Sequence, residues 1–316
     1  MASHAPKLRY SAVTGYFKND AQPTSSAGPG LEAVTLPGLG LIDQVYETDE
    51  AFDPQREKHG WERFAHYLGH LNKTGGGKTV YKLLYAARHG EGYHNVKERE
   101  VGTPAWESHW AKLEGDGHTT WADAHLTATG IAQARAMATF WADAAVTARL
   151  PLARSHYCSP HARCLETCEL AFATLALPPG AGEVPVPPFR PVVKEMIRER
   201  LGVHTCDRRR TRSWIRESHP LFVVEEGLTE EDELWRADVR ETLEEHAVRM
   251  RAFLDELFAG AGGGDGEQIV SVTAHSGSIR ALYEVLGHPG RKVAPGTIVP
   301  VLIKGEVVDD AAVAQP

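Results

Sequence analysis

The sequence lacks any long apolar run, any excess of basic charge and any paired cysteine motif. No stretch approaches the roughly 18–20 consecutive apolar residues of a membrane span, and the N-terminal segment has no apolar signal-peptide core. Lys and Arg total 34 against 42 Asp and Glu, a formal net charge of −8, so we expect neither nucleic acid nor a membrane as partner. The four cysteines include no CxxC pair, which predicts a cytoplasmic protein without disulfides.

What is present is an ordinary globular composition with many histidines. Hydrophobic residues make up 42% and charged residues 24% of the 316 residues, which is too apolar for a disordered chain. This length accommodates one large α/β domain or two small ones. The 16 histidines could be surface residues, metal ligands or catalytic groups, and composition does not decide among these roles.

Short apolar segments alternate with amphipathic segments over most of the chain. The segments with strand character are residues 82–87, 155–159, 191–196, 268–273 and 298–303. The segments with helical character are residues 50–73, 127–148, 160–175, 240–258 and 276–286. This alternation predicts a three-layer α/β/α protein with a mostly parallel central sheet.

We expect a single domain over residues 1–316. Residues 1–78 would form an irregular arm and a helix, residues 79–305 the core, and residues 306–316 a tail. Residues 204–239 interrupt the alternation with charged, tryptophan-containing sequence. That length predicts an insertion near the functional site, not a separate domain.

Three of the expected strands end in motifs that carry histidine and arginine. These motifs are RHGEGYHN at residues 88–95, SPHAR at residues 159–163 and HSGSIR at residues 275–280. Loops at the carboxyl ends of parallel strands build sites in such folds. Arg163 falls at the start of an expected helix, where free N–H groups favour anions, and its guanidinium adds a fork that suits phosphate oxygens. Gly90 allows a bound anion to approach the backbone closely.

In this order, RHGExxHN, SPxxRxxxT and HSGxIRAL resemble the motifs of the histidine phosphatase superfamily, which has the phosphoglycerate mutase-like fold. The resemblance covers about residues 80–305. RHGEGYHNV, followed later by IRERLGVHTCDRRR, looks most like the fungal branch of this family. The resemblance implies a small phosphorylated substrate. It also implies chemistry without a metal or cofactor, because arginines supply the positive charge.

The resemblance further implies a covalent mechanism. His89 would attack phosphorus and become a phosphohistidine. Arg88, Arg163 and His275 would hold the non-bridging oxygens and neutralise their charge. Other residues of the three motifs are expected to contact the substrate: Asn95, Gly90, Ser276, Gly277, His161 and His94.

The leaving alcohol needs a proton, which a carboxylate supplies in this family. Glu199, within IRERLG, matches the family's acidic position best. Glu195, four residues earlier, is the second candidate and is otherwise expected to line the substrate pocket. Once the alcohol has left, the same carboxylate would act as base for the attacking water.

Two other functions remain open, a phosphoglycerate-type mutase and a non-catalytic phospholigand-binding protein. A mutase would use the same residues but return the phosphoryl group to substrate inside an enclosed site. The charged insertion and the irregular arm do not resemble the usual mutase loops, which favours hydrolysis. A pure binding protein needs neither the nucleophile His89 nor the acid Glu199.

An arginine run at residues 208–212 has two interpretations. One is ion pairing with acidic residues nearby in sequence: Glu225, Glu226 and residues 230–233. The other is a lid that attracts a second anionic group on the substrate. Trp214 and Trp235 in the same insertion would either cover the substrate or pack the insertion onto the core.

Overall fold

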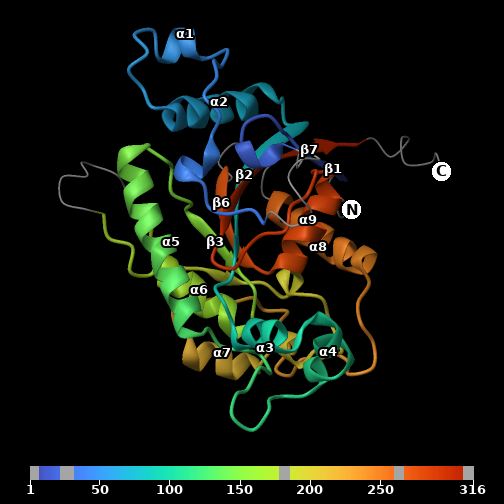
Figure 1. The fold of residues 1–316 in the computed structure, drawn as a ribbon. Coiled ribbons are helices and arrows are strands. Elements are labelled where there is room, and N and C mark those ends of the chain that lie inside the picture. The colour runs from blue at the N-terminus through green and yellow to red at the C-terminus, as the bar shows by residue number, and fades with distance from the viewer. Residues whose placement is uncertain (1–6, 22–31, 178–185, 260–266, 309–316) are drawn as a thin grey trace.

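The computed structural model describes residues 7–21, 32–177, 186–259 and 267–308. Within these residues, seven strands form one sheet in the order β1-β7-β2-β6-β3-β4-β5 (Figure 1). The strands are β1 (Leu8–Ala12), β2 (Thr79–Arg88), β3 (Ser155–Cys158), β4 (Val192–Val193), β5 (Val223–Val224), β6 (Ile269–Ala274) and β7 (Ile298–Val307).

The central strands of this sheet run parallel. β2 pairs with β6, β6 with β3, β3 with β4 and β4 with β5, all in parallel register. β7 is antiparallel to both β2 and β1. The predicted three-layer α/β/α fold with a mostly parallel sheet is therefore confirmed.

Helices cover both faces of the sheet. The helices of the described residues are α1 (Asp49–Phe52), α2 (Gly60–Thr74), α3 (Tyr93–Val101), α4 (Thr103–Ser108), α5 (Ala128–Thr147), α6 (Ala162–Phe172), α7 (Arg212–Ser218), α8 (Leu243–Ala259) and α9 (Ser276–Leu286). Figure 1 shows α5 and α6 on one side of the sheet and α8 and α9 on the other. At one end of the molecule α3, α4 and α7 gather, and α1 and α2 lie at the opposite end (Figure 1).

Alternation along β2 shows how the two hydrophobic layers arise. Leu83 and Tyr85 belong to one core cluster with residues of α2, α5 and α6. Leu84 and Ala86 belong to the other cluster, with residues of α8 and α9. Successive side chains of a strand point to opposite faces, so one apolar run can serve both layers.

The expected helix that starts at Thr127 is confirmed, because the Thr127 hydroxyl caps α5 by accepting a hydrogen bond from the Gly130 N–H at 3.1 Å. The helix expected over residues 160–175, with Pro160 in its first turn, begins two residues later than predicted. Helix α6 begins at Ala162, whose N–H is held by the Asp123 carboxylate at 3.0 Å. This capping residue is distant in sequence, so no local pattern predicts where the helix begins.

The arm and the insertion both add strands that the sequence does not predict. β1 lies in the supposedly irregular arm and covers the edge of β7, with Leu8 opposite Val307. β5 lies within the 204–239 insertion and extends the other edge of the sheet. The strand expected over 191–196 is reduced to β4. β7 continues to Val307, into the expected tail, of which residues 309–316 lie outside the described residues.

None of the helices described in the chain is both long and apolar enough to cross a lipid bilayer.

Candidate active site

The three motifs meet because their strands are neighbours in the sheet. β2, β6 and β3 are adjacent and parallel, with Arg88 opposite Ala274 and Cys158 opposite Thr273. Their carboxyl ends therefore share one edge. The ring centroids of His89 and His275 lie 5.1 Å apart there, and those of His161 and His275 lie 4.8 Å apart.

The contacts of His89 define which nitrogen is free to react. Its Nδ1 lies 2.7 Å from the carbonyl oxygen of Gly90. A carbonyl oxygen only accepts hydrogen bonds, so Nδ1 must carry the proton and donate it. In the neutral ring the lone pair is therefore on Nε2.

The surroundings of His89 keep this imidazole neutral. His89 is only 2% exposed. Burial, followed by the positive charges of Arg163 and Arg88, holds the pKa of His89 well below its usual range. The ring therefore has the unprotonated form that a nucleophile requires, near two guanidinium groups.

Several buried nitrogen atoms around His89 have no hydrogen-bond partner among the described residues. They are Arg88 Nε, Arg163 Nε, His94 Nδ1 and His161 Nε2. Buried polar groups normally find partners, so a cluster of unpaired ones needs an explanation. Two guanidinium charges and several unpaired nitrogens would suit the negative charge and the oxygen atoms of a phosphate group. His94 belongs to this cluster, since its ring centroid lies 5.5 Å from that of His89.

A serine hydroxyl lies between His161 and His275. Ser159 Oγ lies 2.8 Å from His275 Nε2 and 3.0 Å from His161 Nδ1. One hydroxyl can donate to one ring and accept from the other, which fixes both imidazoles relative to each other. Sequence reasoning assigned no role to Ser159, although it is the first residue of the second motif.

Arg163 is anchored by the insertion. Its guanidinium donates to the Cys206 carbonyl oxygen at 2.6 Å and to Asp207 Oδ1 at 3.1 Å. Asp207 Oδ2 accepts from Arg240 at 2.9 Å. Burial alone would raise the pKa of Asp207, but Arg240 and Arg163 outweigh burial and hold this pKa below its usual range. Asp207 is a positioning residue that the sequence analysis missed.

The two candidate proton donors, Glu199 and Glu195, have different hydrogen-bond partners. Glu199 Oε2 accepts a hydrogen bond from the Gly277 N–H at 3.0 Å, at the start of α9 beside His275. Glu195 instead accepts from Arg198 at 2.7 Å and from Arg209 at 3.1 Å, and it is buried. Both guanidinium groups form ion pairs with this carboxylate. These contacts favour Glu199 over Glu195 as the proton donor, and both assignments stay predictions.

Three other expected contact residues have local structural tasks. A Cβ atom at Gly90 would overlap the carbonyl oxygen of Gly130, so this glycine allows α5 to pack closely against the loop. A Cβ atom at Gly277 would overlap the Glu199 carboxylate. Asn95 Oδ1 accepts from the Gly92 N–H at 3.0 Å and so closes the first turn of α3. Ser276 is the first residue of α9, directly after His275.

The arginine run is largely engaged in ion pairs. The pairs of the run are Arg208 with Glu114, Arg209 with Glu195 and Arg212 with Glu230. Arg198, which precedes the run, pairs with Glu195 and Asp232. Glu225 pairs with Lys194 instead. Trp235 Nε1 donates to the His204 carbonyl oxygen, and Trp214 packs against the core. The contacts favour the ion-pair interpretation over a substrate lid.

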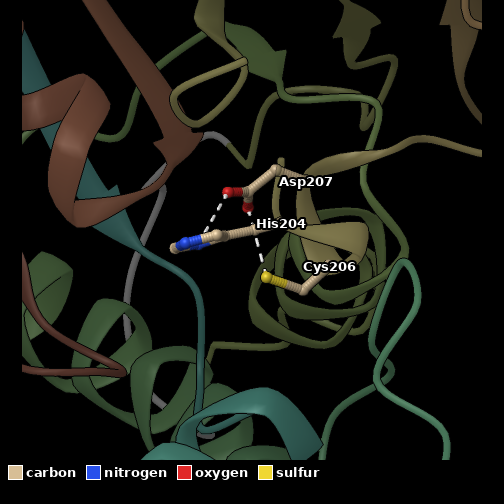
Figure 2. A group of neighbouring side chains, drawn as sticks. All are labelled: His204, Cys206 and Asp207. Carbon is tan, nitrogen blue, oxygen red and sulfur yellow. Dashed lines mark hydrogen bonds and ion pairs between the residues drawn. The ribbon is translucent and has the colours of Figure 1, made fainter. Parts of the chain in front are cut away.

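Figure 2 shows a compact group with metal-ligand atoms, His204, Cys206 and Asp207. His204 Nδ1 lies 3.8 Å from Asp207 Oδ2, and Cys206 Sγ lies 3.6 Å from Asp207 Oδ1 (Figure 2). Burial, then the Asp207 charge, raises the pKa of the Cys206 thiol well above its usual range, whereas a metal ligand must be a thiolate. Asp207 is already neutralised by two arginines. The charges here disfavour a cation.

Comparison with known proteins agrees with the motifs. The histidine phosphatase superfamily (branch 1) matches residues 84–294. A probable phosphoglycerate mutase of Arthroderma benhamiae is 41% identical over 310 residues, which cover 98% of this chain and 88% of that protein. A probable phosphoglycerate mutase of Saccharomyces cerevisiae is 32% identical and covers 92% of this chain and 96% of that protein. A crystal structure of phosphoglycerate mutase from Bacillus anthracis aligns with 72% of this chain and 89% of its own, at a TM-score of 0.43 and 17% identity.

The resemblance to this family, predicted from the three motifs, is thereby confirmed. The predicted similarity to its fungal branch agrees with the two fungal relatives. This chain belongs to the histidine phosphatase superfamily, branch 1.

Proposed function

We propose that this protein is a phosphatase that hydrolyses a small phosphorylated metabolite through a phosphohistidine on His89. The observation that carries the proposal is the neutral His89 ring, with its lone pair on Nε2, beside Arg88 and Arg163. The unpartnered buried nitrogens around it support binding of a phosphate group. Members of this superfamily are phosphatases or mutases, so both activities fit the family.

In the first step, His89 Nε2 attacks phosphorus in line with the ester oxygen. The N–P bond forms as the P–O bond to the alcohol breaks. Arg88, Arg163 and His275 stabilise the charge on the non-bridging oxygens. Glu199, protonated at this stage, gives its proton to the leaving alkoxide, so the alcohol departs neutral.

In the second step, water attacks the phosphohistidine. The Glu199 carboxylate takes the proton of this water, and the N–P bond breaks to regenerate neutral His89 and release inorganic phosphate. Both steps use the same two residues, one as nucleophile and leaving group, the other as acid and then base. Guanidinium groups supply the positive charge that stabilises the transition state.

A phosphoglycerate-type mutase is the second candidate, because the two fungal relatives carry that name. It would use the first step unchanged and then return the phosphoryl group to an alcohol instead of water. The two functions therefore differ only in what reaches the phosphohistidine.

Turnover, trapping and binding measurements together separate these functions. The purified chain should release inorganic phosphate from 4-nitrophenyl phosphate with EDTA present, and orthovanadate should inhibit it because it mimics five-coordinate phosphorus. A rapid alkaline quench should trap phosphate on His89, detected by peptide mass spectrometry. Transfer to a second alcohol without free phosphate would establish the mutase instead. Ligand binding without turnover of any ester would establish a binding protein.

The role of Glu199 predicts a dependence on the leaving group. Nitrophenolate departs without protonation, whereas an alkoxide requires a proton. We expect Glu199→Gln to lower kcat/KM for an alkyl phosphate by about 100-fold or more, and for 4-nitrophenyl phosphate far less. Initial rates on both esters measure this difference. Equal losses on the two esters would remove Glu199 from the role of proton donor. Glu226→Gln, at an exposed glutamate away from these contacts, is the matched control.

A further inference from the structure

The segment that carries Glu199 has no regular secondary structure to hold it. Strand β4 ends at Val193, and residues 198–201 belong to neither a helix nor a strand. The Glu199 carboxylate nevertheless accepts two backbone hydrogen bonds, from the Gly277 N–H at 3.0 Å and from the Arg200 N–H at 2.9 Å. A proton donor must stand within hydrogen-bond reach of the oxygen that it protonates. The backbone of this segment therefore needs support from elsewhere in the fold.

Arg249 of helix α8 binds three carbonyl oxygens of this segment. Its guanidinium donates to the carbonyl oxygens of Met196 at 2.6 Å, Arg198 at 3.1 Å and Glu199 at 3.0 Å. A guanidinium has five N–H donors in a planar fork, so one side chain can bind several acceptors at once. Buried carbonyl oxygens need such partners wherever no helix or strand supplies them.

The carboxylate of Glu241 completes this arrangement. Glu241 Oε1 accepts from Arg249 Nε at 2.9 Å, and Oε2 accepts from Arg249 Nη2 at 2.7 Å. Oε2 also accepts from the Leu201 N–H at 3.0 Å. Leu201 directly follows Arg200, the residue whose N–H donates to Glu199 Oε1. The buried pair of Arg249 and Glu241 thus binds the backbone on both sides of the Glu199 side chain.

Two further side chains bind the same segment. Ser278 Oγ, on α9, donates to the carbonyl oxygens of Arg198 at 2.8 Å and Ile197 at 3.2 Å. His246 Nε2, on α8, lies 3.1 Å from the Arg198 carbonyl oxygen and must carry the proton, because a carbonyl oxygen only accepts. Side chains of α8 and α9 thus bind all four carbonyl oxygens of residues 196–199.

We propose that Arg249 is a positioning residue for proton transfer, which holds the backbone of Glu199 so that its carboxyl group reaches the leaving oxygen. This inference rests on the proposed function, because it takes Glu199 as the proton donor. In the part of the chain that the structure describes, the hydrogen bonds of Arg249 go to this segment and to Glu241. A change at Arg249 should therefore impair protonation of the leaving group and spare the attack by His89.

Two aryl phosphates of closely similar shape test the inference with the full chain. Phenolate is a poorer leaving group than 4-nitrophenolate, so phenyl phosphate depends more on proton donation. Arg249→Lys keeps a positive charge beside Glu241, but its three donors share one nitrogen and cannot span three carbonyl oxygens. We expect this variant to lower kcat/KM for phenyl phosphate about tenfold more than for 4-nitrophenyl phosphate. Steady-state rates on both esters measure this ratio.

A double-mutant cycle separates positioning from general damage to the fold. Glu199→Gln should change the ratio between the two esters in the same direction and by more. In the Glu199→Gln background, Arg249→Lys should change the ratio by less than about twofold, because no acid is then left to position. An effect of Arg249→Lys on the ratio that is equally large in both backgrounds would overturn the positioning role.

Arg63→Lys is the matched control, because Arg63 also binds a carbonyl oxygen and a carboxylate at once. It donates to the Gln44 carbonyl oxygen at 2.9 Å and to Asp49 at 2.8 Å. It lies on α2, at the opposite end of the molecule from α3 and α4 (Figure 1). The ratio between the esters should stay at its wild-type value in this variant. If Arg249→Lys does not fold, the double variant Arg249→Gln/Glu241→Gln carries the same test, since it leaves no unpaired buried charge.

The outcomes distinguish this inference from the proposed function. Equal losses on both esters in Arg249→Lys, with a selective loss in Glu199→Gln, would overturn only the positioning role. Equal losses in Glu199→Gln as well would remove the proton donor and the positioning role together, and would leave the phosphohistidine on His89 in place. No turnover of either ester by the wild-type chain would overturn the proposed function and the positioning role with it.

Discussion

The His89→Ala variant is expected to lose phosphatase activity by more than about 10⁴-fold in kcat/KM, because it removes the atom that forms the covalent intermediate. The residues that bind phosphate would remain, since Arg88 is held by the Val293 carbonyl oxygen and Arg163 by Asp207. Neither contact passes through the His89 side chain. Steady-state rates on 4-nitrophenyl phosphate and trapping of the phosphohistidine both measure the loss.

The variant should still fold and bind inorganic phosphate. His89 makes one side-chain hydrogen bond, to its neighbour Gly90, so its removal leaves few partners unsatisfied. Calorimetric titration with phosphate should therefore detect binding in the variant. His118→Ala, at an exposed histidine, is the control for the substitution itself and should retain wild-type rates. Retention of more than about one hundredth of the activity in His89→Ala would disprove the covalent mechanism, given the size of effect expected for a nucleophile.

The sequence predicts the site well where local motifs follow parallel strands. His89, His161 and His275 each come directly after or shortly after a strand, and β2, β6 and β3 turn out to be neighbours. Because the carboxyl ends of parallel strands share an edge, the three motifs must meet once the strand order is right. The meeting of the three motifs at one edge of the sheet could thus be inferred without knowing any long-range contact.

The residues that support the centre could not be inferred in this way. Asp207 reaches Arg163 across 44 positions, and Asp123 reaches the first N–H of α6 across 39. Neither pair leaves a periodic signal, since each contact depends on how a loop folds over the sheet. Glu195 shows the converse. Its residue type and spacing suit a proton donor, and only the positions of Arg198 and Arg209 count against that role.

The sequence did not predict strand β1 because this strand, too, depends on a contact with a distant part of the chain. It has five residues in a segment near glycine- and proline-rich sequence, and it becomes a strand only because β7 offers an unpaired edge at the other end of the chain.

Acidification is expected to destabilise this protein steeply below pH 6.5. The folded chain holds several buried histidines whose pKa lies below the usual value near 6.5, with burial as the largest cause. They are His89, His94, His161 and His275, lowered well below that value, and His156 and His246, lowered to about 4. In the unfolded chain the same rings take up protons near pH 6.5.

The sign of the effect follows from this difference. Below pH 6.5 the unfolded chain binds more protons than the folded chain, so the free energy of unfolding falls as the pH falls. Each such histidine contributes a slope of up to about 1.4 kcal/mol per pH unit, and the whole stability of a domain is only about 5–15 kcal/mol. Carboxylates with lowered pKa, such as Asp207 and Asp232, lose their contribution only at more acidic pH. Histidines therefore dominate between pH 6.5 and 5.

Urea unfolding at pH 7.5, 6.5 and 5.5 in phosphate-free buffer measures the slope, which should exceed about 1.4 kcal/mol per pH unit below pH 6.5 because more than one proton is taken up. The His94→Asn variant should show a slope shallower by about one proton equivalent, whatever its stability at pH 7.5. His118→Asn is the control and should leave the slope unchanged, because this histidine is exposed to solvent. Added phosphate should raise the stability at each pH, since it binds only the folded site. A free energy of unfolding that is constant from pH 7.5 to 5.5 would show that these rings are protonated in the folded chain, and would remove the neutral His89 on which the nucleophile depends.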